Sequence, residues 1–252
     1  MLFRSYLGGR RFRPRPVDKV IAEMAAIDNN RLFIVDNSLA QDLNWEIELF
    51  REMIPLKKKW CCHPIEEDDT VLDLAAQAGA WYVYQAVFDM SDHIRRRIRR
   101  YHDHGIAVEG TILLGLDDHT EDYIKRFIDF LMEIELDLAE FTVLTPFPHT
   151  RTFDDFEREG RILTHDWDAY TADRVVFQPR HMSPERLQEL YAEAWDTFYR
   201  DEPQNYKMFK LFKTVVEREK ADGTFRPRRR EMATRRFGRR GGGGGDTPAA
   251  AN

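Results

Sequence analysis

Residues 106–147 read IAVEGTILLGLDDHTEDYIKRFIDFLMEIELDLAEFTVLTPF and contain one complete strand–helix–strand unit. Residues 106–115 form an apolar run bounded by glycine, which is typical of a buried strand. Residues 120–134 repeat their apolar side chains with the helical period, and residues 138–147 return to a strand pattern. This order predicts two parallel strands joined by a right-handed helical crossover.

The same alternation extends toward the N-terminus. Apolar and β-branched runs predict three earlier strands, at residues 31–39, 57–68 and 81–88. Helical spacing of apolar residues predicts four helices, at residues 17–24, 45–53, 68–79 and 94–105. Five strands separated by helices predict an α/β fold with a parallel sheet, which is either doubly wound or part of a β/α barrel.

Polar side chains cluster where the predicted strands end. Because the active sites of β/α barrels are built at the carboxyl ends of the strands, this clustering favours a barrel with a site on that face. The residues concerned are Asp36, Asn37, His63, Gln85, Asp117, Asp118 and Thr145.

The C-terminal part follows a different pattern. Ser183 is expected to cap a helix that begins at Pro184, and a second helix is predicted at residues 206–219. From residue 221 the chain is rich in Arg and Gly and has too few apolar residues to form a core. We therefore expect four regions, namely a basic N-terminal segment (1–16), a partial barrel (17–182), a helical extension (183–220) and a disordered tail (221–252).

The composition excludes several classes of protein. No stretch approaches the roughly 20 apolar residues needed to cross a bilayer, and the N-terminus lacks the apolar run of a signal peptide. We therefore expect a cytoplasmic protein without a membrane span. The net charge of −6 conceals two Arg-rich ends around an acidic middle. An acidic body is a poor nucleic-acid binder, so no specific nucleic-acid partner is expected and the ends are interpreted as solvated and flexible.

Two features leave alternatives open. Cys61 and Cys62 are adjacent, which excludes a structural disulfide framework, and they are interpreted as buried thiols on opposite faces of a strand. Gly110 and Gly115 bracket a predicted strand, where glycine indicates either the close approach of a ligand or a bend at a barrel corner.

Acidic residues raise a third question. Oxygen and imidazole ligands for a divalent metal, and hence a metal-dependent hydrolase, could come from Asp36, His63, Glu66, Asp68 and Asp118. Their spacing matches no metal-binding motif, so a solvated acidic rim is the favoured interpretation.

Several longer segments resemble a known family. They are RRFRPRPVDKVIAEM (10–24), FIVDNSLAQD (33–42), HDHGIAVEGTILLGLDDHTEDYIKR (102–126), FTVLTPFPHTRTFDDFEREGRILTHDWDAY (141–170) and VVFQPRHMSPERLQELY (175–191). Together they resemble the radical SAM superfamily, and specifically its members that carry a cobalamin-binding domain. The segments around TPFP-T and EGRIL-T-DW are the most specific, and the resemblance covers residues 10–200.

The resemblance implies a TIM-type partial β/α barrel that binds S-adenosylmethionine (SAM) and a 4Fe-4S iron-sulfur cluster. In this family three cysteines in a C-x-x-x-C-x-x-C motif hold the cluster, and one electron cleaves SAM to a 5′-deoxyadenosyl radical, which attacks a small-molecule substrate. In the cobalamin group the outcome is often methylation of an unreactive carbon.

The family's SAM-binding positions transfer to nine residues of this chain. Those near the amino-acid end of SAM are Asp36 and Asn37, and the strand that approaches SAM through its backbone supplies Gly110, Thr111 and Ile112. Gln85 matches a polar position facing the ribose, and the positions close to the adenine are Leu144, Thr145 and Pro146. No catalytic residue and no metal ligand of this chain is assigned.

The chain also departs from the family pattern. The three cluster cysteines, the first barrel strand and the cobalamin domain have no counterpart here, since MLFRSYLGG (1–9) occupies the place where the motif is expected and Cys61 and Cys62 match neither its spacing nor its position. We therefore expect an incomplete, N-terminally truncated barrel that an upstream chain or domain completes. Three functions remain open, namely a fragment of an active radical SAM enzyme, a non-catalytic remnant or SAM-binding partner subunit, and the metal-dependent hydrolase.

Overall fold

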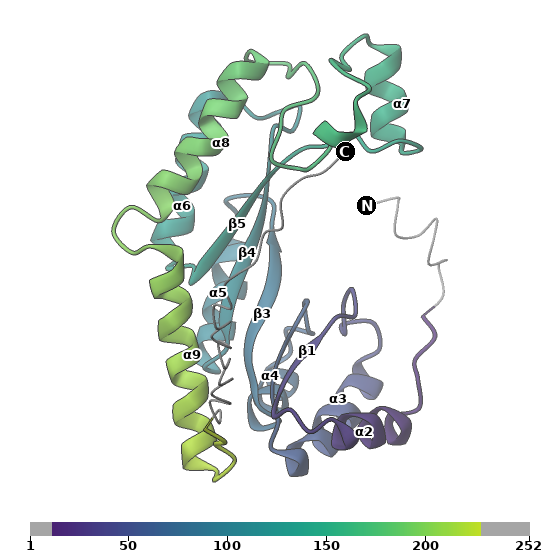
Figure 1. Ribbon diagram of the computed structural model, residues 1–252, viewed down its shortest axis with the longest axis vertical. Helices are drawn as coiled ribbons and strands as arrows, with labels where there is room; N and C mark the ends of the chain where they lie inside the picture. Colours follow the sequence, from purple (N-terminus) through teal and green to yellow (C-terminus); the bar gives the residue numbers. More distant parts are fainter. Residues whose placement is uncertain (1–11, 228–252) are drawn as a thin grey trace, which may run out of the picture.

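The computed structural model describes residues 12–227 and contains one parallel sheet flanked by helices (Figure 1). Its five strands lie side by side in chain order, namely β1 (Arg31–Ile34), β2 (Lys59–Cys62), β3 (Ala80–Val87), β4 (Ala107–Leu114) and β5 (Leu138–Val143). Every neighbouring pair is parallel. The sequence prediction of five parallel strands is confirmed, and the open sheet agrees with an incomplete barrel.

One helix precedes the first strand, and further helices connect the strands as predicted. They are α2 (Val17–Ala26), α3 (Leu43–Met53), α4 (Asp69–Gln77), α5 (Asp92–Asp103) and α6 (Glu121–Glu133), with a short 3-10 turn η1 (Ile54–Leu56) after α3. Side-chain oxygens of Ser91 and Thr120 accept a backbone hydrogen bond at the start of α5 and α6. After α4, Gly79 has a φ of +101°, and a Cβ there would lie 1.9 Å from the Lys58 carbonyl oxygen. Only glycine fits this turn.

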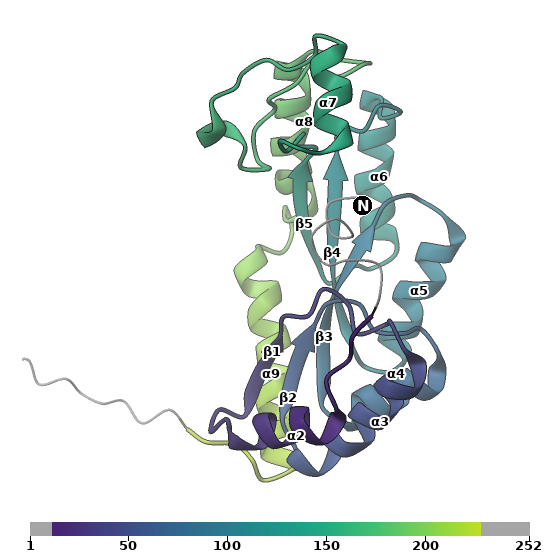
Figure 2. The same cartoon turned by 90° about the vertical axis from the view of Figure 1, so that its right-hand side faces the viewer.

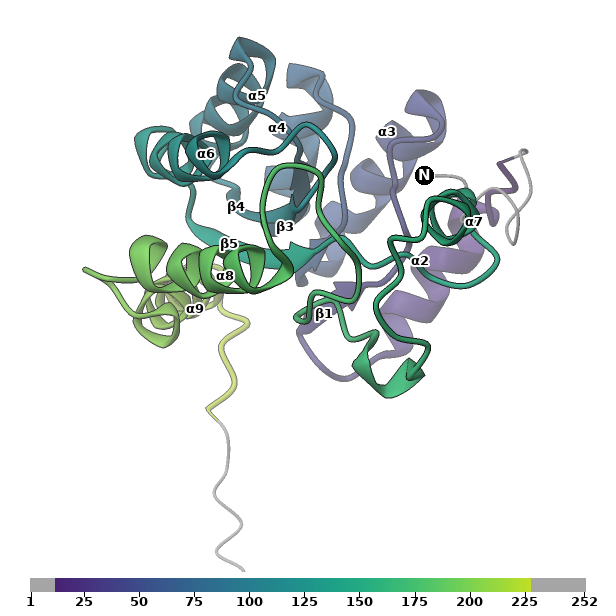
Figure 3. The ribbon, with the colours of Figure 1, turned by 90° about the horizontal axis from the view of Figure 1, so that it is seen from above.

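Helices α3 to α6 cover one face of the sheet (Figure 3). Alternate strand residues point into the core beneath these helices, among them Ile34, Cys62, Val83, Ile112 and Phe141. The residues between them point to the opposite side. We call this opposite side the open face and define it by Phe33, Cys61, Tyr84, Glu109, Thr111 and Glu140.

The two C-terminal helices occupy different places. Helix α8 (Pro184–Phe198) packs against α6 and β5, and Ser183 caps it as predicted. Just after α8, the Tyr199 hydroxyl accepts a hydrogen bond from Ala139 N at 2.9 Å and donates one to Ala139 O at 2.8 Å, which satisfies the outer edge of β5.

Helix α9 (Gln204–Ala221) lies over the N-terminal part of the open face rather than against the helix-covered side. Its Val215 is buried together with Trp81, Tyr82 and Leu138. Near its end, the buried Glu219 accepts two hydrogen bonds from Arg31, at 2.9 and 2.7 Å. The expectation that both C-terminal helices pack outside the strand–helix body is therefore correct for α8 and wrong for α9.

Residues 145–182 extend beyond the C-terminal ends of β4 and β5 (Figure 2). This excursion contains α7 (Arg151–Arg158), a 3-10 turn η2 (Trp167–Ala169) and an antiparallel bridge between Ile162 and Phe177. Helix α7 was not predicted, although Thr150 caps it and Phe153 and Phe156 form its buried side. In the part of the chain that the structure describes, no helix is long and apolar enough to cross a membrane. The expected basic segment (1–16) falls mostly, and the expected tail (221–252) largely, outside the described residues.

Gly110 lies in the middle of β4, and its missing side chain would point into the core. A Cβ at this position would approach Leu136 Cδ2 to 2.6 Å and Val87 Cγ2 to 3.2 Å. The space beside Gly110 is therefore filled by Leu136, which supplies a packing reason for glycine that is independent of any ligand.

We expect Gly110→Ala to destabilise the protein by about 1–3 kcal/mol through this overlap. The double variant Gly110→Ala, Leu136→Val should recover part of the loss because the shorter side chain vacates the space. Urea unfolding measures both. A Gly110→Ala protein of unchanged stability that has lost affinity for SAM would instead support the close approach of a ligand.

Glu46 on α3 is a carboxylic acid that is fully buried, with 0% of the residue exposed. Its Oε1 accepts a hydrogen bond from Glu66 N at 3.1 Å, which ties the loop after β2 to α3. Its Oε2 has no hydrogen-bond partner in the structure. Burial raises the pKa of Glu46 from 4.5 to about 7.

Because the unfolded chain ionises first, the free energy of unfolding should fall as the pH rises from about 5 to about 8. A glutamine at position 46 has the shape of the protonated glutamic acid, and its side-chain oxygen can still accept the hydrogen bond from Glu66 N. We expect Glu46→Gln to flatten this pH dependence and to be more stable than the wild type at about pH 8, by on the order of 2 to 3 kcal/mol. Urea titrations at both pH values measure the effect, with Glu48→Gln, an exposed acid of the same helix, as control. Parallel wild-type and Glu46→Gln profiles would contradict this assignment.

Candidate functional site

The nine predicted SAM-binding residues fall into three places. Thr111 lies on the open face. Gln85, Gly110 and Ile112 belong to the opposite, helix-covered side. The remaining five follow the carboxyl ends of the two outermost strands, where Asp36 and Asn37 come after β1 and Leu144, Thr145 and Pro146 come after β5. Three strands separate these two groups along the same edge of the sheet.

Gln85 does not sit where the sequence predicted. It lies within β3, two residues before the strand ends, and not at the strand end. It shares the orientation of Val83 and Val87, is only 4% exposed, and donates from Nε2 to Ala86 O at 3.1 Å. The expectation of a strand-end residue is wrong because Gln85 is a buried residue inside β3, whose end at Val87 agrees with the predicted strand. Its chain neighbours Tyr84 and Ala86 point to the open face instead.

The groups at the strand ends have different surroundings. Asp36 is exposed and lines a cavity of 280 Å³ between α2, α3 and β1, together with Phe12, Met24 and Trp45. Thr145 donates a hydrogen bond to Val143 O at 3.1 Å, and Leu144 N donates to Leu114 O at 2.8 Å. A role of these residues in binding SAM stays a prediction.

The open face carries a group of aromatic rings that sequence analysis missed. Phe33, His63 and Tyr84, which we call the aromatic trio, are mutual neighbours with ring centroids 5.4 to 6.1 Å apart. Phe33 is 51% exposed although it lies within a strand. The sequence feature that could have indicated these rings is the alternation of aromatic residues in WYVYQAVF (81–88). The register between strands is also needed, because it brings the three rings together.

Two carboxylates follow the trio across the open face, on β4 and β5, and they were missed as well. Glu109 pairs in register with Tyr84, and Glu140 pairs with Thr111 on the next strand. Glu109 is 7% exposed, and burial, with a contribution from the charge of Glu140, raises its pKa from 4.5 to about 7. Among residues 12–227, neither carboxylate forms an ion pair with Lys, Arg or His. The sequence feature that could have indicated these carboxylates is the occurrence of an acidic residue within an otherwise apolar strand segment.

The two cysteines lie on opposite faces, as predicted. Cys61 is on the open face, where burial raises its pKa to about 11, and Cys62 is in the main core, where burial also raises its pKa. A cluster ligand must be a thiolate, which both environments disfavour. Since the family motif needs three cysteines and the chain has two, its cysteines do not fit a cluster of this kind.

Two of the five residues proposed as metal ligands have other contacts in the structure. Asp68 caps α4 by accepting from Thr70 N, and His63 belongs to the aromatic trio. Within the described range, no three His, Cys, Asp or Glu residues gather closely enough to hold a metal ion. The hydrolase interpretation is therefore not supported by the geometry.

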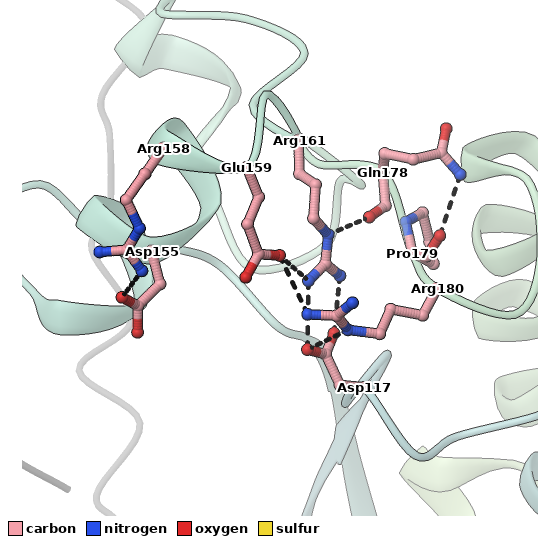
Figure 4. Close-up of polar contacts among 8 residues, drawn as sticks. All are labelled: Asp117, Asp155, Arg158, Glu159, Arg161, Gln178, Pro179 and Arg180. Atoms are coloured by element: carbon pink, nitrogen blue, oxygen red, sulfur yellow. Dashed lines mark hydrogen bonds and ion pairs between the residues drawn. The ribbon is translucent and has the colours of Figure 1, made fainter.

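An ion-pair cluster fixes the excursion at the edge of the sheet (Figure 4). Arg161 forms two hydrogen bonds with Asp117, at 2.6 and 3.1 Å, and its Nε donates to Gln178 O at 2.8 Å. Arg180 adds contacts to Asp117 at 2.7 Å and to Glu159 at 3.0 Å. The Arg161 guanidinium also stacks 3.9 Å above the Phe156 ring.

This cluster joins the end of β4 to the bridge that follows α7. The hydrogen bonds from Arg161 and Arg180 hold the pKa of Asp117 below its usual range. The charges of Asp117 and Glu159 are therefore balanced by those of Arg161 and Arg180.

Comparison with known proteins gives three methyltransferases and one cyclase among the relatives. A bacteriochlorophyllide d C-12(1)-methyltransferase of Chlorobaculum tepidum is 26% identical over 215 residues, which cover 76% of this chain and 47% of that protein. An uncharacterised methyltransferase of Pyrococcus horikoshii is 30% identical over 95 residues, which cover 38% of this chain and 21% of that protein. The chain thus spans less than half of the length of these relatives. No family model matches it.

A solved structure shares the fold. The radical S-adenosylmethionine methyltransferase TsrM from Kitasatospora setae, with tryptophan substrate and a SAM analogue bound, has a TM-score of 0.56 and 18% sequence identity. The match covers 76% of this chain and 47% of that protein. A second TsrM structure, with cobalamin and a [4Fe-4S] cluster bound, has a TM-score of 0.52. The chain is therefore similar in sequence to a methyltransferase over most of its length, and it shares the fold of a radical SAM methyltransferase.

Proposed function

We propose that this chain is the SAM- and substrate-binding barrel of a radical SAM methyltransferase of the cobalamin-associated group. The observation that carries the proposal is the similarity to a bacteriochlorophyllide d methyltransferase over 215 residues, which cover 76% of this chain. The bound cobalamin, cluster and SAM analogue of the TsrM structures support the same choice of cofactors.

The arrangement of the open face suits a ligand that enters from the carboxyl edge. Helix α9 fills the N-terminal part of this face with Met208, Leu211 and Val215. The part toward the strand ends presents Thr111 and the two carboxylates beside the aromatic trio. Small polar and aromatic groups above a closed base are the usual lining of a ligand site.

The iron–sulfur cluster has to be held by cysteines that this chain does not contain. Cys61 and Cys62 lie on opposite faces of β2, and burial keeps both protonated. We propose that an upstream chain or domain supplies the cluster motif and completes the barrel. A cytoplasmic location stays a prediction.

A second candidate is a non-catalytic SAM-binding subunit. The observation that favours it is the presence of two cysteines in the whole sequence, one fewer than the motif requires. The two candidates differ in whether SAM is cleaved once a cluster-bearing segment is joined to the chain.

The test is a fusion of this chain to the part of the Chlorobaculum tepidum relative that precedes the matched region. After anaerobic reconstitution and with dithionite as the electron donor, the fusion should release 5′-deoxyadenosine or S-adenosylhomocysteine from SAM, measured by mass spectrometry. The same fusion with the cluster cysteines replaced by Ala should release neither and serves as the control.

The chain alone should gain no iron–sulfur absorption on reconstitution. A fusion that carries iron and sulfide but binds no SAM in equilibrium dialysis would contradict the proposal. SAM binding without cleavage would favour the second candidate, a non-catalytic SAM-binding subunit.

A further inference from the structure

We infer that the aromatic trio and the carboxylates Glu109 and Glu140 bind a flat conjugated ring system that carries a positive charge or N–H donors. The inference deepens the proposed function and rests on it, since it names the class of substrate for the same open face.

The aromatic trio supplies the surface for the flat ring. Phe33, His63 and Tyr84 come from three adjacent strand segments, and their ring planes are inclined to one another by only 33 to 34°. Three inclined rings with centroids about 5 to 6 Å apart form a continuous apolar patch wide enough to contact a fused ring system. The exposure of Phe33 within a strand is unusual for core packing and leaves its ring available.

The carboxylates set the charge of the ligand. Glu109 is in register with Tyr84, so its carboxyl group lies next to the trio, and Glu140 adds a second acid one strand away. The titratable groups near Glu109 are Glu140 on β5, Cys61 on β2 and Tyr199 after α8, and none of them is a cation. Two neighbouring acids without a cation, one of them buried, favour a ligand that brings positive charge or donates hydrogen bonds.

A third polar group, the hydroxyl of Tyr82, lies on the same strand as Tyr84 and two residues before it. Tyr82 is 2% exposed, its ring packs edge-on against Tyr84 at 5.1 Å, and its buried hydroxyl has no hydrogen-bond partner in the structure. Buried hydroxyl groups are nearly always paired in proteins, so an unpaired one beneath the trio indicates that a further group completes this region.

Two flat probes of equal size and opposite charge test the inference. Proflavine is a cationic three-ring dye, and 9-anthracenecarboxylate is its anionic counterpart. Fluorescence titration of the full chain should give binding of proflavine and none of 9-anthracenecarboxylate. The double variant Glu109→Gln, Glu140→Gln should weaken proflavine binding roughly tenfold or more. Tyr84→Leu should weaken it several-fold, by roughly the strength of a cation–π contact.

Two control variants change the same residue types elsewhere on the surface. Asp129→Asn on α6 and Phe209→Leu on α9 replace an exposed acid and an exposed aromatic, and both should leave the affinity unchanged. Thermal unfolding checks that each variant is folded. As a second measurement, wild-type affinity should rise between about pH 6 and about pH 8 as Glu109 ionises, and Glu109→Gln should lose this rise.

Equal binding of both probes, or equal losses in the site and control variants, would overturn the inference. This test requires neither SAM nor a cluster, so its result is separate from that of the fusion experiment. A fusion that cleaves SAM while the chain shows no preference for proflavine leaves the proposed function standing and removes the inference. Selective proflavine binding without SAM cleavage supports the inference and removes the proposed function.

Discussion

The fold depends on one constraint, namely that every crossover between parallel strands passes over the same face of the sheet. Helices α3 to α6 bury that face, and Ile112, Phe141 and Val83 fill the space beneath them. Because strand side chains alternate, each residue in the core fixes the outward direction of its neighbours. A face with no crossover helix is left over, and it carries the alternate strand residues.

Two later parts of the chain divide this open face. Helix α9 closes the N-terminal part, where Glu219 is bound by Arg31 and Val215 is buried against Tyr82. At the other end, Arg161 and Asp117 fix the excursion that follows β5. The part between these two closures has aromatic rings and carboxylates but no paired cation among the described residues, and our inference of a flat cationic ligand rests on this part.

The side chains of the open face suit the recognition of a ligand but not the binding of iron. Its buried acid, with a pKa raised to about 7, and its exposed rings are suited to recognising and orienting a ligand. Its cysteine is protonated and alone, so it is not suited to hold iron. This division agrees with a chain that spans less than half of its methyltransferase relatives and with our proposal that cluster chemistry is supplied by another segment.

The sequence by itself determined the order and type of nearly all elements, because periodicity and caps such as Ser183 are local signals. It also determined that Cys61 and Cys62 point apart, since adjacent strand residues always do. Only the tertiary structure decided that Gln85 faces the helices, that α9 crosses the open face, and that Phe33, His63 and Tyr84 meet beside Glu109. These facts depend on the register between strands and on the docking of a distant helix, and both are set by contacts between residues far apart in the chain.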